Sequence, residues 1–239
     1  MAEILVYTAG GSGAAPYAVE ALRKAGIPLV DHPTPEVTHL LLDVPSREIP
    51  EGLLDRLPEN ITVVGGTLTC PALDGYRKLD LLKHEGYLAQ NAAITADCAI
   101  RVAASRMERV FSGSRTLVIG WGRIGKCLAS LLKSIGCSVT VAARKDADRA
   151  ILAAIGYEVV HPENLTKPQQ FHLIFNTAPA PVLNRKILSR CPDTLKIDLA
   201  SRPGLEGADV IWARGLPGLY APESSGKLIA ETFLKEVGA

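Results

Sequence analysis

Residues 116–125 read Thr-Leu-Val-Ile-Gly-Trp-Gly-Arg-Ile-Gly, and this stretch decides the fold of the chain. An apolar, β-branched strand runs into a G-x-G-x-x-G turn that opens a helix. The first glycine permits a tight turn, the second lets a pyrophosphate approach the backbone, and the third allows the helix to pack closely on the strand. The sequence therefore predicts a dinucleotide site formed by Gly120, Trp121, Gly122, Arg123, Ile124 and Gly125.

Glycines also stand in turns for backbone reasons alone, so the flanking sequence has to distinguish the two interpretations. Residues 127–135 have the pattern of a helix, and residues 138–143 have that of the next strand. A strand, a glycine turn, a helix and a second strand form the unit that binds dinucleotides through free N–H groups at the helix start. This context favours the nucleotide site.

The end of the second strand indicates which dinucleotide binds. A site selective for NAD places Asp or Glu there, where it accepts hydrogen bonds from the ribose 2′-hydroxyl. Here Ala143 stands at that position, and Arg144 and Lys145 follow it. Two cations can pair with a 2′-phosphate, so NADP is favoured over NAD. The alternative is that both cations are solvent-exposed residues at a strand end and bind no ligand.

The composition excludes several classes of function. The chain has 239 residues, of which 47% are hydrophobic and 21% charged, so it can bury one large core or two small ones. Its formal net charge of +1 and the absence of a basic run argue against a nucleic-acid partner or an acidic membrane surface. No apolar stretch reaches the ~18 residues that a membrane helix needs.

The five cysteines lack the spacing of a zinc site, and their odd number does not suggest a disulfide framework. The five histidines are scattered without metal-ligand spacing, so we expect no metal. Cys70 has no evident activating base, which argues against a catalytic thiol. Residues 1–7 lack the features of a signal peptide. We therefore expect a soluble, cytoplasmic protein.

Strand and helix patterns alternate along the chain in two series. In the first, we expect strands at 4–8, 39–43, 61–64 and 86–89, and helices at 16–25, 53–57 and 76–84. In the second, we expect strands at 116–119, 138–142, 158–160, 172–176, 195–199 and 210–212, and a final helix at 223–236.

These series predict an α/β fold: a Rossmann-type doubly wound parallel sheet with a second, smaller α/β domain. The smaller domain covers residues 1–90 and the dinucleotide-binding domain covers residues 91–239. A long helix over residues 91–110 is expected to connect the two. The final helix, 223–236, is predicted to pack back on the amino-terminal domain.

Ligands of open α/β sheets bind beyond the carboxyl ends of the strands, so residues that follow strands are candidates for the site. One segment follows the fourth strand of the second series, and it consists of Asn176, Thr177, Ala178 and Pro179. A second contains Ala200 and Arg202, and a third, rich in Gly and Pro, contains Gly218. Each of these segments can also be an ordinary loop.

The segments 91–95, 120–125, 143–144, 176–177, 197–204 (Ile-Asp-Leu-Ala-Ser-Arg-Pro-Gly) and 215–222 (Gly-Leu-Pro-Gly-Leu-Tyr-Ala-Pro) together resemble the dipicolinate synthase A-subunit family. The resemblance covers residues 91–234 well and is weaker over the first 90. It implies a relationship to 2-hydroxyacid dehydrogenases and the NADP-linked oxidation of dihydrodipicolinate to the pyridine dicarboxylate. It also implies spore-forming bacteria as a source and, as a partner, the separate flavin-binding B-subunit of dipicolinate synthase.

This chemistry needs cationic or N–H partners for two carboxylates, whereas the gain of aromaticity reduces the need for a strong base. No His follows residue 172, so the Glu and His that assist Arg in hydroxyacid dehydrogenases are not recognisable. We assign no catalytic base. The expected substrate contacts are Arg202, Ser12, Gly13, Thr69, Thr95 and Gly218, with the backbone N–H groups of the turn at 10–13 as a second anion site.

Three hypotheses remain open at this point. The first is an NADP-dependent oxidoreductase of the dipicolinate synthase type. The second is a cofactor-binding homologue without catalysis, and the third is another two-domain NADP enzyme, of the shikimate dehydrogenase type. A homodimer is expected because two-fold oligomers are the most common.

Overall fold

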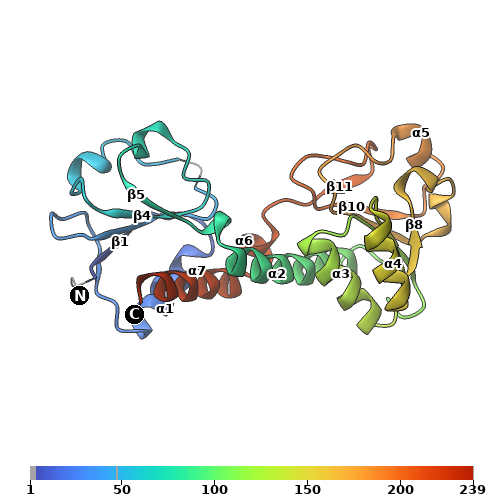
Figure 1. Cartoon of the computed structure of the whole chain (residues 1–239), viewed down its shortest axis with the longest axis horizontal. Coiled ribbons are helices and arrows are strands. Elements are labelled where there is room, and N and C mark those ends of the chain that lie inside the picture. The colour runs from blue at the N-terminus through green and yellow to red at the C-terminus, as the bar shows by residue number, and fades with distance from the viewer. Residues whose placement is uncertain (1–3, 47, 239) are drawn as a thin grey trace. The chain divides into compact units, whose positions relative to one another are not determined.

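The computed structural model describes residues 4–46 and 48–238 (Figure 1). The chain divides into two compact units, of which the first comprises the described residues up to Asn91 and those from Pro217 on. The second unit comprises Ala92–Leu216. The expected domains were residues 1–90 and 91–239. In the structure unit 1 extends to Asn91, and the described residues from Pro217 on, expected in the second domain, belong to unit 1.

Unit 1 contains a parallel five-stranded sheet in the order β2-β1-β3-β4-β5. Its strands are β1 (Val6–Thr8), β2 (Leu29–Val30), β3 (His39–Leu41), β4 (Thr62–Gly65) and β5 (Arg77–Asp80). The chain leaves β1 toward β2 and returns to β3 on its other side, so the order reverses between β1 and β3. This is the position at which an open α/β sheet has its crevice.

Two helices, α1 (Ala15–Lys24) and α7 (Pro222–Val237), pack against each other beside this sheet (Figure 1). The other face is covered by irregular chain and the short 3₁₀ helices η1 (Leu54–Arg56) and η2 (Pro71–Leu73). Alternation along β3 explains both layers: Leu40 is buried in the cluster beneath η1, whereas His39 contacts Phe233 of α7 edge to face.

Gly226 sets the distance between α1 and α7. A Cβ at this position would lie 2.4 Å from the carbonyl oxygen of Ala14 and 2.7 Å from the backbone nitrogen of Ala18. We expect Gly226→Ala to destabilise unit 1 by about 1–3 kcal/mol, because the helices must separate. Urea denaturation measures the change, with the exposed Ser224→Ala on the same helix as the control. A stability equal to the wild type would show that the two helices adjust freely.

Two expectations in unit 1 are wrong. Residues 76–84, expected as a helix, form the edge strand β5 and the 3₁₀ helix η3 (Leu81–Lys83), because pairing with β4 overrides local propensity. Residues 86–89, expected as a strand, lie in the first turns of the long helix α2 (Glu85–Ala104). The Nδ1 atom of His84 accepts the N–H of Tyr87 at 3.0 Å and so satisfies one free donor at this helix start.

Unit 2 contains a parallel six-stranded sheet in the order β11-β10-β9-β6-β7-β8. Its strands are β6 (Arg115–Ile119), β7 (Ser138–Ala142), β8 (Glu158–Val160), β9 (Leu173–Asn176), β10 (Leu195–Asp198) and β11 (Val210–Trp212). Its helices after α2 are α3 (Arg123–Ser134), α4 (Asp146–Ala154), the short η4 (Pro162–Asn164), η5 (Pro168–Gln170) and α5 (Arg185–Leu188). Helix α6 (Leu216–Tyr220) begins at Leu216, the last residue of unit 2.

Both faces of this sheet are covered, as in a doubly wound fold. Helix α3 packs against β6 and β7, and α4 packs against β8. Leu117 and Ile119 belong to the cluster on the face that carries α5, and Val118 between them is also fully buried. The α/β fold class expected from the sequence is confirmed. The strand order reverses between β6 and β9, which places the fingerprint of residues 120–125 at the crevice.

Candidate functional site

The first and third glycines of the fingerprint are required by the protein itself. Gly120 has a φ of +100°, and a Cβ there would lie 2.5 Å from Thr177 Oγ1. A Cβ on Gly125 would lie only 2.2 Å from the carbonyl oxygen of Gly120. These two glycines therefore bring α3 against the end of β6, and a turn without a ligand would need them too.

Gly122 is different, because nothing in the protein requires a glycine there. Its backbone is extended, with φ of −80°, and no protein atom lies within 4 Å of the place its Cβ would occupy. It is the N-cap of α3, which has no side-chain cap and no acidic residue in its first turn. A ligand that must approach these N–H groups is the physical reason for a glycine at this position. The site therefore fits a dinucleotide pyrophosphate.

The loop after β9 is fastened to the same turn. Thr177 donates to the carbonyl oxygen of Ile119 twice, from its backbone nitrogen at 2.8 Å and from Oγ1 at 2.9 Å. Ala178 is half-buried and Pro179 is exposed directly after it. The structure thus brings the fingerprint together with the segment after β9.

A buried polar network fixes the next loop. Asn176 and Asp198 are both fully buried, and the amide nitrogen of Asn176 donates to Asp198 Oδ1 at 2.9 Å. The same oxygen accepts from the N–H of Ala200 at 3.0 Å, and Oδ2 accepts from Gly204 at 2.7 Å and Leu205 at 3.0 Å. The carboxylate therefore holds both ends of the loop that presents Arg202.

This network changes how two predicted residues can act. The side chain of Asn176 also bonds the backbone of Ala178, by its nitrogen at 3.0 Å to the oxygen and by its oxygen at 3.1 Å to the N–H. Ala200 is buried, whereas Arg202 is exposed. The side chain of Asn176 therefore fixes the backbone of the site, and Arg202 is the exposed charged side chain of this loop.

The third part of the site is the end of β7. Ala143 is buried, and the exposed Arg144 and Lys145 follow it. The structure adds Arg149, which sequence reasoning missed: its Nη1 donates to the carbonyl oxygens of Ala143 at 2.7 Å and Arg144 at 2.6 Å. The sequence signal that could have identified it is the position of this arginine, one helical turn after Lys145.

The remaining fingerprint side chains lie around the start of α3. Trp121 contacts Tyr157 edge to face, with the ring centroids 6.1 Å apart, and Lys126 Nζ lies 5.9 Å from the Trp121 ring. Arg123 is exposed and Ile124 is half-buried. The indole thus leans toward α4 and β8, on the side of the sheet end that carries Arg144.

The second expected anion site, the turn at 10–13, needs a correction. The N–H of Gly11 donates to Asp43 Oδ2 at 2.9 Å, and the N–H of Ser12 donates to both carboxylate oxygens at 3.1 and 3.2 Å. The turn does bind a carboxylate, but the carboxylate is that of Asp43. The cavity beside it, which Gly10 and Asp43 line, measures about 10 Å³, space for one water and not for a dicarboxylate.

The other predicted substrate residues are distributed over both units. In unit 1, Gly13 lies beside α6, since a Cβ on it would be 2.9 Å from the carbonyl oxygen of Gly218. Thr69 is exposed after β4. In unit 2, Thr95 is buried in α2. Their contacts with a substrate stay predictions.

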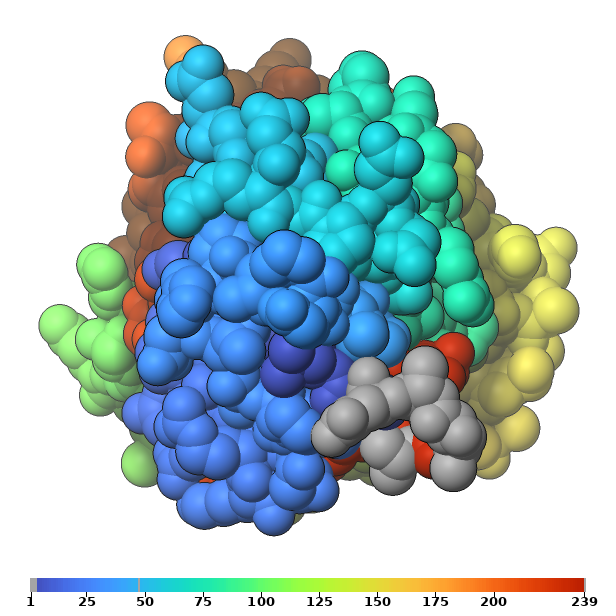
Figure 2. Space-filling view, turned by 90° about the vertical axis from the view of Figure 1, so that its left-hand side faces the viewer, coloured from blue at the N-terminus to red at the C-terminus, as the bar shows by residue number. Residues whose placement is uncertain are grey.

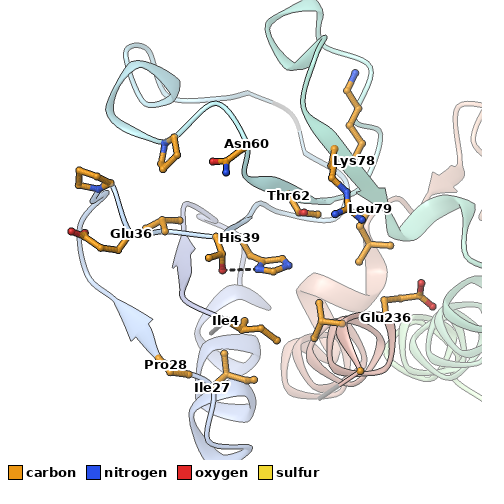
Figure 3. Close-up of a pocket in the computed structure, with 17 residues that line it drawn as sticks. Ile4, Ile27, Pro28, Glu36, His39, Asn60, Thr62, Lys78, Leu79 and Glu236 are labelled. Atoms are coloured by element: carbon orange, nitrogen blue, oxygen red, sulfur yellow. Dashed lines mark hydrogen bonds between the residues drawn. The ribbon is translucent and has the colours of Figure 1, made fainter. Parts of the chain in front are cut away.

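A hollow of about 1140 Å³ lies elsewhere in unit 1. It opens at the amino ends of β3, β4 and β5, on the face shown in Figure 2. His39 points into it and shares a 2.9 Å hydrogen bond with Thr38 (Figure 3). Burial and the charge of Arg77 lower the pKa of His39. Because ligands of such sheets bind at the carboxyl ends, we do not assign the substrate to this hollow.

Among the described residues, no group of His, Cys, Asp and Glu is arranged to hold a metal ion. Burial raises the pKa of the thiols of Cys98, Cys137 and Cys191, which keeps them protonated and unreactive. Within residues 4–46 and 48–238, no helix is long and apolar enough to cross a membrane.

Comparisons with known proteins agree with this geometry. Residues 84–196 match the family model "D-isomer specific 2-hydroxyacid dehydrogenase, NAD binding domain", which indicates a nicotinamide dinucleotide cofactor. The chain is 31% identical over 197 residues to the dipicolinate synthase A-subunit of Bacillus subtilis (strain 168). The match covers 76% of this chain and 66% of that protein.

Solved structures give the same fold. The A chain of dipicolinate synthase from Bacillus subtilis superposes with a TM-score of 0.83 at 23% identity, over 100% of this chain and 97% of that one. The dipicolinate synthase A-subunit from Bacillus halodurans gives a TM-score of 0.80 at 22% identity, over 99% of each chain. The expected relationship to 2-hydroxyacid dehydrogenases is confirmed by the family match.

Proposed function

The chain belongs to the dipicolinate synthase A-subunit family, and from this premise we propose that it is an NADP-dependent oxidoreductase that oxidises dihydrodipicolinate to dipicolinate. The observation that carries the proposal is the open space at Gly122. A Cβ would fit there without touching the protein, so the glycine serves a ligand at the amino end of α3.

The choice of NADP rests on the end of β7. Ala143 leaves no carboxylate to accept hydrogen bonds from a ribose 2′-hydroxyl or to repel a 2′-phosphate. Arg144 and Lys145 are exposed there, and in the part of the chain that the structure describes neither side chain forms an ion pair. Two such cations beside a missing acid favour the phosphorylated cofactor.

We assign the other predicted residues along the cofactor. Residues 120–125 would hold the pyrophosphate, and Asn176–Pro179 and Ala200 would line the remainder of the cofactor site. When bound, the cofactor supplies the hydride acceptor. The chain's own part is to bind, orient and exclude water.

The substrate's two carboxylates need partners in the protein. Arg202 is the exposed cation of the loop that Asp198 holds, and we propose that it binds one carboxylate through a charge-assisted pair. Oxidation of a dihydropyridine releases a hydride and a proton, and the aromatic product favours that direction. The reaction therefore depends on orientation more than on a strong base. Gly13, Thr69, Thr95 and Gly218 remain proposed substrate contacts, whereas the backbone N–H of Ser12 is already bound by Asp43.

The biological setting is also a proposal. The name of the Bacillus subtilis relative describes one subunit of a synthase, so we propose that the flavin-binding B-subunit of such a synthase is the partner. We further propose a cytoplasmic homodimer that works during sporulation. Size-exclusion chromatography with light scattering, with and without the flavin-binding partner, tests both associations.

Arg144→Ala tests the assignment of the cofactor. We expect the Kd for NADP(H) to rise about tenfold to a hundredfold, because one charge-assisted hydrogen bond contributes about 1.5–3 kcal/mol. The Kd for NAD(H), which lacks the phosphate, should stay the same. Fluorescence titration measures both constants. Equal losses for the two cofactors would argue against a 2′-phosphate at Arg144.

Turnover tests the reaction itself. With NADP⁺ and dihydrodipicolinate, we expect reduced nicotinamide and aromatic dipicolinate to form in equal amounts. Binding without turnover, even with the flavin-binding partner present, would favour a non-catalytic homologue. Turnover of an alicyclic acid instead would favour an enzyme of the shikimate dehydrogenase type.

A further inference from the structure

Arg149 on the first turn of α4 holds the backbone of the segment that carries the two cations. Its Nη1 reaches the carbonyl oxygen of Ala143 at 2.7 Å and that of Arg144 at 2.6 Å. Its Nη2 pairs with the carboxylate of Asp146. One guanidinium therefore fixes two successive peptide units at the end of β7.

The orientation of these peptide units decides where their N–H groups point. A trans peptide is planar, and its N–H points opposite to its C=O. Because the carbonyls of Ala143 and Arg144 face Arg149, the N–H groups of Arg144 and Lys145 face away from it. Over residues 4–46 and 48–238, neither N–H group has a hydrogen-bond partner. They are thus presented on the same short segment as two exposed cations.

Arg149 is poorly placed to bind a ligand itself. An Nη atom carries two hydrogens, and both hydrogens of Nη1 are used by the two carbonyls. The Asp146 carboxylate balances the charge of Arg149, and the Arg149 side chain is only 20% exposed. The contacts of Arg149 therefore hold the backbone of the loop after β7.

We propose that Arg149 is a positioning residue that selects NADP over NAD, because it orients the Arg144–Lys145 segment toward the 2′-phosphate without touching the cofactor. This inference rests on the proposed NADP dependence. Without the guanidinium, the carbonyls of Ala143 and Arg144 are free to rotate. The N–H groups and side chains of Arg144 and Lys145 are then no longer oriented toward the same ligand group.

Arg149→Ala tests the inference. We expect the Kd for NADP⁺ and for adenosine 2′,5′-bisphosphate to rise about tenfold, the size of one lost charge-assisted contact. The Kd for NAD⁺ and for 5′-AMP should stay within about twofold of the wild type. Arg115→Ala is the matched control, because Arg115 Nε also holds a loop carbonyl, that of Gln170 at 2.6 Å, but at the opposite, amino edge of the sheet.

A double-mutant cycle with Arg144→Ala separates positioning from direct binding. If Arg149 acts through Arg144, its removal should cost far less in the Arg144→Ala background. Additive losses, equal losses for NADP⁺ and NAD⁺, or an unchanged Kd for NADP⁺ would each overturn the inference. If the wild type binds NAD⁺ as tightly as NADP⁺, the proposed cofactor fails and this inference fails with it. A wild type that prefers NADP⁺ with an unaffected Arg149→Ala overturns the inference alone.

Discussion

Gly122→Val is expected to abolish binding of NADP(H) and leave the fold intact. The backbone there is extended, which valine favours, and no protein atom lies within 4 Å of the Cβ position. The free energy of unfolding should therefore fall by no more than about 1 kcal/mol, since valine is a poorer N-cap residue than glycine. The valine side chain would occupy the space of the pyrophosphate, so we expect the Kd to rise at least about a hundredfold, or about 2.8 kcal/mol.

Gly125→Ala provides the opposite pattern as a control. Its Cβ would lie 2.2 Å from the carbonyl oxygen of Gly120, so this variant should lose stability because α3 must move from β6. Denaturation and cofactor titration on both variants distinguish a glycine that serves a ligand from one that serves packing. A folded Gly122→Val with wild-type affinity would contradict the assignment of the site.

Asp198→Asn is expected to give the largest loss of stability. All four groups that contact its buried carboxylate are N–H donors: Asn176 and Ala200 on one oxygen, and Gly204 and Leu205 on the other. An amide would turn its own NH₂ toward two of these donors in either orientation. Two buried N–H groups then lose their acceptor, which costs about 3–5 kcal/mol.

Urea denaturation measures this loss, and the exposed Asp193→Asn in the same unit is the matched control, expected within about 0.5 kcal/mol of the wild type. Turnover should fall as well, since the loop that carries Arg202 loses its anchor. If Asp198→Asn unfolds at the same urea concentration as the control, the network does not hold the loop as described.

Sequence patterns identified the dinucleotide-binding unit well because each of its elements has a strong local signal. The strands at 158–160 and 210–212 have the expected bounds, and the fingerprint opens a helix as expected. The cations at the end of β7 were found because the position is counted from the glycines. Arg149 was missed, since only the structure shows that a helix turns its side chain back to the loop carbonyls.

Unit 1 was harder to predict because its secondary structure depends more on contacts between distant segments than on local sequence patterns. Residues 77–80 become a strand because β4 offers a partner edge, and the carboxylate of Asp80 then accepts the N–H groups of Thr67 and Leu68 from the loop after β4. The glycine turn after β1 looks like an anion site, and it is one. Its anion is Asp43, which stands about 30 residues away in the sequence and is brought there only by the parallel pairing of β1 and β3.

Thermal unfolding in rising concentrations of NADP(H) and NAD(H) tests the central claim most directly. A ligand at about 100 times its Kd stabilises the folded protein by about 2.7 kcal/mol. The cradle at Gly122 and the cations Arg144 and Lys145 predict a rise in melting temperature at far lower concentrations of NADP(H) than of NAD(H). No rise with either cofactor would contradict the assignment of a dinucleotide-dependent oxidoreductase.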